Sequence, residues 1–125
     1  DMAMISNAVF LQKKGVLKGP LQFNLVMNVP GSIAGTTRNL QFLVDSLPEG
    51  STWQVSGIGS SQVPLLTMAI AMGGNVRTGL EDVLTMRKGV PATNKMLLER
   101  VLRIADAVGR PIATADEARE YLSLT

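Results

Sequence analysis

Residues 52–72 read TWQVSGIGSSQVPLLTMAIAM, a β-rich run, a glycine turn and an apolar helical run in immediate succession. Thr52–Ser56 is predicted to be a strand, and about Gln62–Met72 a helix whose first turn tolerates Pro64. Apolar side chains cover nearly the whole circumference of this helix. We therefore expect it to be buried against a sheet on one side and against neighbouring helices or another subunit on the other.

The same order of elements occurs before and after this segment. A strand is predicted at Leu21–Met27, followed by a helix that Thr36 or Thr37 caps. A third strand is predicted at Asn75–Gly79. A long helix is predicted at about Asn94–Val108, with Leu97, Val101, Ile104 and Val108 as its buried stripe, and it ends before a Gly and a Pro. This alternation predicts an α/β fold, and the strand spacing of roughly 25 to 30 residues suits parallel βα units.

Two further helices flank these units. Ile5–Lys14 is predicted to be a leading helix, and Thr114 with Glu117 forms a capping box that opens a short helix through Leu122. We expect the whole chain to be the C-terminal half of a TIM (β/α)8 barrel and part of a longer protein. Its two open strand edges would otherwise invite aggregation, so an N-terminal half or a second chain is expected to pair with them.

Composition excludes several classes of function. The 125 residues are 46% hydrophobic, carry a net charge of +2 and include neither cysteine nor histidine. No apolar run reaches the roughly 18 residues that span a bilayer, so we expect a soluble protein with no membrane segment. The lack of cysteine fits a cytoplasmic protein. Basic residues are scattered and aromatic residues are few, so nucleic-acid binding is not expected.

The most informative polar cluster lies in residues 73–82, which read GGNVRTGLED. Arg77 precedes the adjacent carboxylates Glu81 and Asp82 by four and five residues. The two carboxylates lie just past the carboxyl end of the predicted strand. This pattern offers a metal ligand or a general base beside an anion-binding group, at the rim where α/β proteins bind ligands. The competing interpretation is an ion pair of Arg77 with either carboxylate that only stiffens the loop.

The glycine turn of residues 57–62 is a second candidate site. Gly57, Gly59 and Ser60 precede a helix, and their free amides suit a phosphate or a thioester cofactor. Glu81 lies about twenty residues beyond Gly59, where a dinucleotide site has its ribose-binding acid. Against dinucleotide binding, Gln62 occupies the position of the third glycine. A purely structural turn is the third interpretation.

Two adjacent basic pairs, Lys13-Lys14 and Arg87-Lys88, are most simply solvated helix ends or loops. Arg87-Lys88 differs from the first pair because it follows the two carboxylates along the chain. It is therefore placed to reach an anionic ligand.

Three blocks together resemble one family: Gly57-Ile58-Gly59 with Gln62, the run 73–82, and the tail 109–119, GRPIATADEAR. They resemble the β-keto acid cleavage enzymes, also called 3-keto-5-aminohexanoate cleavage proteins, over essentially the whole chain. The resemblance implies a fold similar to eight-stranded βα barrels. It also implies a zinc-dependent retro-Claisen exchange of a β-keto acid with acetyl-CoA, giving acetoacetate and a new CoA ester.

By position, the resemblance makes Glu81 the carboxylate ligand of zinc and Asp82 the general base. It makes Arg77 the group that binds substrate and cooperates with that base. Two departures matter: Asn75 stands where the family often has histidine, and the family's two zinc histidines come from an earlier strand, whereas this chain has no histidine. One carboxylate is too few for a catalytic zinc site, which needs about three protein ligands.

The 125 residues alone are therefore expected to be inactive. We expect an N-terminal half-barrel or a second subunit to complete the site, with a homo-oligomer as the assembly. The alternatives are a truncated barrel that acts only as an interaction module, and a nucleotide-binding α/β domain that uses the glycine turn.

Overall fold

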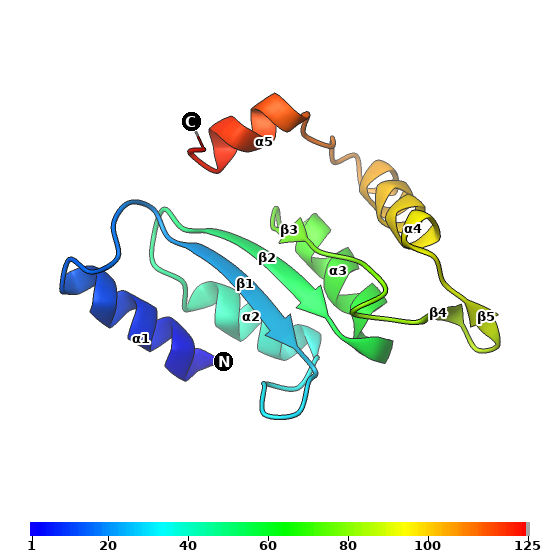
Figure 1. Cartoon of the computed structure of the whole chain (residues 1–125), viewed down its shortest axis with the longest axis horizontal. Helices are drawn as coiled ribbons and strands as arrows, with labels where there is room; N and C mark the ends of the chain where they lie inside the picture. The colour runs from blue at the N-terminus through cyan, green and yellow to red at the C-terminus, as the bar shows by residue number, and fades with distance from the viewer. Residues whose placement is uncertain (125) are drawn as a thin grey trace.

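The computed structural model describes residues 1–124 and has an α/β architecture (Figure 1). The elements in chain order are α1 (Met2–Lys13), β1 (Gln22–Met27), α2 (Thr37–Asp45), β2 (Thr52–Gly57), a 3-10 turn (Gly59–Ser61), α3 (Gln62–Ala71), β3 (Asn75–Val76), β4 (Thr85–Arg87), β5 (Val90–Pro91), α4 (Asn94–Ala107) and α5 (Ala115–Tyr121). Strands β1, β2 and β3 form a parallel sheet in that order, and β4 and β5 form a separate antiparallel hairpin. The predicted α/β class with parallel strands is confirmed.

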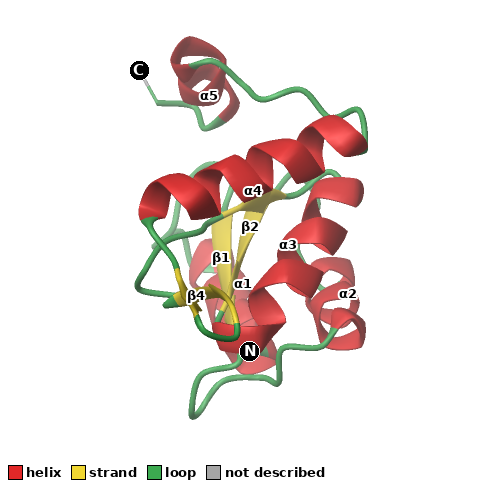
Figure 2. Cartoon of the chain, turned by 90° about the vertical axis from the view of Figure 1, so that its right-hand side faces the viewer, coloured by secondary structure: helices red, strands yellow, loops and turns green. Residues whose placement is uncertain are grey.

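One face of the sheet carries the hydrophobic core. The register pairs Leu25 with Val55 and Met27 with Gly57, so alternate side chains of both strands point to the same side. Leu25, Met27 and Val55 are buried there with apolar residues of α2, α3 and α4. Figure 2 shows α2 and α3 together beside the strands. Helix α3 is buried on the side that faces the sheet, as predicted. Its other side is exposed within the described residues, at Val63, Pro64, Thr67 and Ala71.

The other face of the sheet is polar. It carries Asn24, Gln54 and Ser56, and the buried Ser56 hydroxyl donates to Asn24 Oδ1 at 2.9 Å. Helix α5 lies toward the amino ends of the strands, tied by a 2.8 Å bond from Gln22 Nε2 to the Leu122 carbonyl. None of the residues of α5 is buried, and Figure 2 shows the helix set apart beyond α4.

Arg110 links the chain after α4 to the turn before β3. Its Nη1 donates to the Ile70 carbonyl and its Nη2 to the Gly73 carbonyl, each at 3.0 Å, and Nη1 also contacts the Gly74 carbonyl. Gly74 has no room for a side chain, because a Cβ there would meet the Trp53 ring. These contacts fix the entry into β3.

Several predicted boundaries were wrong. Strand β3 has two residues instead of five, because the chain leaves the sheet after Arg77 and turns so that Asp82 and Val83 both donate to the Gly79 carbonyl. The β4–β5 hairpin was not predicted; its strands are three and two residues long and too short to show a periodicity of two.

The predicted helices also differ from the observed ones at their ends. Helix α1 begins at Met2 because Asp1 caps it and accepts bonds from the amides of residues 3 and 4. Helix α4 ends at Ala107, so Val108, which was predicted to be buried, is 48% exposed. Ala105 is buried in its place, beside Val101.

No helix among residues 1–124 combines the length and the hydropathy needed to cross a bilayer.

Candidate functional site

Arg77 and Asp82 form an ion pair where the chain leaves β3. The Arg77 amide donates to the Val55 carbonyl at 3.0 Å, which keeps its backbone against β2. Its guanidinium meets the Asp82 carboxylate with two donors, Nε to Oδ2 at 3.2 Å and Nη2 to Oδ1 in a closer contact. The Asp82 side chain is fully buried, whereas that of Arg77 is 37% exposed. The pair therefore presents its cationic side to solvent.

The neighbouring carboxylates favour the charged form of Arg77. The hydrogen bond to Asp82 raises the pKa of Arg77, burial opposes that rise, and the Asp82 and Glu81 charges add to it. A buried carboxylate without a partner would be strongly destabilising. Arg77 is therefore the group that allows Asp82 to be buried at this position.

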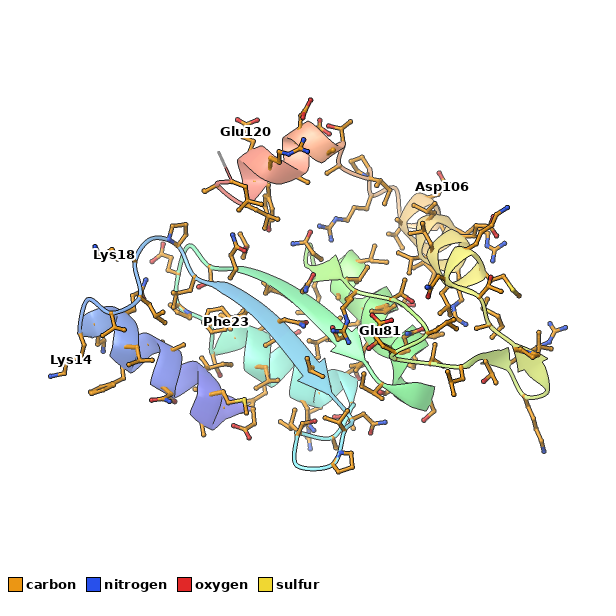
Figure 3. All side chains as sticks on the ribbon, in the orientation of Figure 1. Lys14, Lys18, Phe23, Glu81, Asp106 and Glu120 are labelled. Atoms are coloured by element: carbon orange, nitrogen blue, oxygen red, sulfur yellow. The ribbon has the colours of Figure 1, made fainter. Side chains whose placement is uncertain are left out.

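Glu81, labelled in Figure 3, is the exposed member of the cluster. Its side chain is 59% exposed, and its Oε1 lies 3.9 Å from Arg77 Nε. The carboxylate lies against Gly79, where a Cβ would collide with it. Glu81 can therefore meet a ligand or metal from solvent without breaking a short hydrogen bond.

The cluster supplies only part of a metal site. Among residues 1–124, no group of three or more His, Cys, Asp or Glu side chains gathers closely enough to hold a metal ion. The residues present fit one carboxylate ligand from Glu81 and no more. A zinc ion here would need ligands from outside the described residues.

Backbone contacts hold the loop that carries Asp82 against the glycine turn. The Gly59 amide donates to the Asp82 carbonyl at 2.8 Å. The neighbouring Ile58 carbonyl accepts from Asn28 Nδ2 at 2.9 Å and from Ser61 Oγ at 2.8 Å. The loops after all three strands of the sheet are thus joined at one point.

Sequence reasoning missed the part that Asn28 plays. Its backbone is left-handed, with φ of 72°, a conformation that Asn tolerates better than most residues other than Gly. An Asn directly after a predicted strand and before a Pro-Gly turn was the available signal. Its partner at Ile58 was not visible in the sequence, because the two residues are thirty positions apart.

The three residues proposed to bind a cofactor lie in this turn. A Cβ on Gly57 would lie 2.9 Å from the Gln62 backbone, so the close approach of α3 requires glycine there. The Gly59 amide is used by Asp82, whereas Ser60 is exposed. Gly57 and Gly59 thus have structural roles, and Ser60 is the one free to meet a ligand.

A groove of about 730 Å³ opens beside the two carboxylates. Ser60 and Val63 line it on the α3 side, and the chain from Leu80 to Arg87 lines it on the other. Asn75 lies outside this groove: its Nδ2 donates to the Trp53 carbonyl at 3.1 Å and to the Tyr121 hydroxyl at 3.4 Å. Asn75 therefore contacts α5 rather than the Arg77 cluster.

Three related proteins can be aligned with essentially the whole chain. A 3-keto-5-aminohexanoate cleavage enzyme of Acetoanaerobium sticklandii is 48% identical over 126 residues, which cover 100% of this chain and 46% of the relative. One of Fusobacterium nucleatum is 46% identical, over 99% of this chain and 45% of the relative. A 3-oxoadipate:acetyl-CoA acetyltransferase of Cupriavidus necator is 34% identical, over 99% and 45%. The chain thus spans about half the length of these relatives.

The profile of one protein family covers nearly the same residues. The family is described as beta-keto acid cleavage enzyme, and the match runs over residues 1–124. This agrees with the resemblance in the glycine turn, the run 73–82 and the tail. The chain belongs to the β-keto acid cleavage enzyme family.

Proposed function

We propose that the protein containing this chain exchanges the acyl group of a β-keto acid with that of acetyl-CoA, in a zinc-dependent retro-Claisen reaction. The products are acetoacetate and a new CoA ester. The observation that carries the proposal is the buried Asp82 carboxylate held by Arg77 beside the exposed Glu81, beyond the carboxyl ends of parallel strands. The names of the relatives, two of them β-keto acid cleavage enzymes and one an acetyl-CoA acetyltransferase, support the substrate classes.

Asp82 is proposed as the general base. Its carboxylate would accept the proton whose removal generates the carbon nucleophile, and Arg77 would orient it through two hydrogen bonds. Because both of these donors are engaged, substrate binding by Arg77 would use Nη1, for which the described residues supply no hydrogen bond. A cation at that place suits the carboxylate of a β-keto acid.

Glu81 is proposed as the ligand that this chain gives to zinc. The other ligands would come from a segment or subunit outside the described residues, since one carboxylate is too few. On this proposal the 125 residues alone bind zinc poorly and do not turn over substrate.

We further propose that the chain is the C-terminal half of a (β/α)8 barrel. Strand β1 pairs only with β2 within the described sheet, so its outer edge presents free backbone donors and acceptors. A groove of about 660 Å³ runs beside that edge, between α1 and β1. An added strand would satisfy the edge and fill the groove, and a homo-oligomer is the proposed assembly.

The test is an assay of the complete natural protein with acetyl-CoA and a panel of β-keto acids. Acetoacetate and a CoA ester of the remaining acyl group should appear in equal amounts, together with about one bound zinc per chain. If protein that contains zinc forms acetoacetate from none of the β-keto acids in the panel, the proposal is contradicted.

A further inference from the structure

The loop that leads into the β4–β5 hairpin forms, with Val63 of α3, an apolar wall next to the proposed catalytic groups. Leu80, Leu84 and Val63 line the same groove as Glu81 and Asp82. These three apolar side chains are 37%, 71% and 39% exposed. Several large apolar side chains exposed in one groove indicate a surface that something covers.

The tip of the same hairpin is basic. Arg87 and Lys88 are both exposed, and neither joins an ion pair within residues 1–124. The groove is thus lined by two carboxylates, by exposed apolar side chains and by Arg87, and Lys88 is the next residue along the chain. Asp82 and Arg87 are five residues apart, so the chain between them spans at most about 18 Å.

Contacts to α3 and α4 hold the hairpin in place. Arg100 Nη1 donates to the Met86 carbonyl at 3.2 Å, and its Nη2 donates to Gln62 Oε1 at 2.8 Å. At the start of the loop the Leu80 amide donates to Asn94 Oδ1 at 2.9 Å. Arg100 also lines the groove, but its guanidinium is engaged by Met86 and Gln62. Arg87 and Lys88 are therefore the nearby cations whose side chains have no ion pair within residues 1–124.

We propose that this groove is the binding site for the CoA part of an acyl-CoA. The pantetheine arm lies along Leu80, Leu84 and Val63, with the thioester at Glu81 and Asp82 and the phosphates at Arg87 and Lys88. A ligand with a reactive end, a long arm of mixed polarity and a polyanionic end matches these three kinds of surface. The inference rests on the proposed function, because that function supplies the acyl-CoA.

The test compares CoA with pantetheine, which lacks the phosphates, by titration calorimetry on the complete protein. Replacing Arg87 and Lys88 by Ala together should raise the Kd of CoA by about five- to tenfold and leave that of pantetheine within about twofold. Leu84→Ser should weaken both ligands, because both contain the arm. The matched control is Lys13→Ala with Lys14→Ala, another adjacent basic pair, at the far end of α1 from the hairpin (Figures 1 and 3).

The inference is overturned if wild-type protein does not bind CoA, if the Arg87 and Lys88 change leaves the Kd of CoA unchanged, or if the control pair weakens CoA equally. An altered oligomeric state in Leu84→Ser with no effect of the Arg87 and Lys88 change would make the groove a subunit contact instead. Turnover of a β-keto acid by wild-type protein separates the two proposals. Binding as expected without turnover would refute the proposed function alone, and turnover with an unchanged Kd would refute the groove alone.

Discussion

At the scale of single residues, the ion pair of Arg77 and Asp82 is the decisive feature of the site. It joins a residue at the end of the sheet to a buried carboxylate five positions later. The spacing of Arg77, Glu81 and Asp82 in the sequence allowed two interpretations, an ion pair that stiffens the loop and a cluster of chemically active groups. The structure contains the ion pair, and an ion pair is also what holds a buried carboxylate in a fixed orientation for proton transfer.

Arg77→Lys tests the two-donor contact. Lysine keeps the charge but lacks the planar fork, so one charged hydrogen bond to a buried carboxylate is lost. We expect the free energy of unfolding to fall by about 1.5–3 kcal/mol and kcat to fall with it. Urea denaturation of the variant and of wild-type protein measures the first quantity. Arg119→Lys is the control, since Arg119 pairs with an exposed carboxylate on α5; equal stability losses in the two variants would contradict the special role of Arg77.

The two adjacent carboxylates, Glu81 and Asp82, are expected to have different functions. Glu81→Gln should lower the affinity for zinc, because a neutral amide replaces an anionic ligand. Asp82→Asn should spare zinc while abolishing turnover, because the amide cannot accept the proton. Zinc content by mass spectrometry and acetoacetate formation are measured on the same samples. Full activity in both variants would exclude these roles.

At the scale of elements, the loops after the strands are joined through the peptide group between Ile58 and Gly59, whose carbonyl accepts from Asn28 and whose amide donates to the Asp82 carbonyl. Asn28→Gly keeps the left-handed backbone and loses the bond to that carbonyl, at a cost of about 1 kcal/mol. Asn28→Ala loses the bond and also adopts an unfavourable φ, so its cost should be about 2 kcal/mol or more. Chemical denaturation gives both values. Asn39→Ala is the control: its amide also donates to a carbonyl, that of Ala34 at 2.9 Å, but Asn39 lies in a helix.

An equal loss in Asn28→Gly and Asn28→Ala would show that backbone conformation adds nothing at this position. No loss in either variant would show that the bond to Ile58 does not hold the loops together.

The start of α5 should depend on pH through Glu117. The pKa of Glu117 is lowered mainly by a hydrogen bond from the Thr114 amide and also by one from the Thr114 hydroxyl. The folded form therefore favours the carboxylate, and its stabilising effect is present above the ordinary glutamate pKa. It is lost as pH falls from about 4.3 through the lowered value. Hydrogen exchange of the Thr114 amide is measured by NMR and corrected for the intrinsic exchange rate. In wild-type protein the corrected rate should rise as pH falls over that range. In Glu117→Gln it should not change with pH.

Long elements were predictable from sequence, whereas short ones were not. The helices after β1 and β2 were found because the apolar spacing extends over nine or more positions in each, and Thr36 caps the first of them. The strand at Thr52 was found from its β-rich run before the glycine turn. The hairpin was missed because pairing between so few residues is decided by tertiary contacts such as Arg100 to the Met86 carbonyl. The predicted cluster at residues 77–82 was visible because its members are close in sequence, while the Asn28 to Ile58 contact depends on the fold.

At the scale of the whole molecule, one face of the sheet is closed by helices and the other is polar. Asn24 and Gln54 pair across β1 and β2 on the polar face, and Asn75 continues the row on β3. A polar row of this kind suits the inside of a barrel that holds a polar ligand better than the core of an open sheet. It supports the proposal that strands from outside the described residues complete the fold around this face.

The exchange reaction itself is tested most directly by following carbon. The complete protein is given acetyl-CoA labelled with ¹³C in the acetyl group and an unlabelled 3-keto-5-aminohexanoate, and the products are examined by NMR and mass spectrometry. We expect acetoacetate labelled only in its methyl and ketone carbons, together with an unlabelled CoA ester of the remaining acyl group. Acetoacetate without label, or no acetoacetate from this or any other β-keto acid, would contradict this expectation.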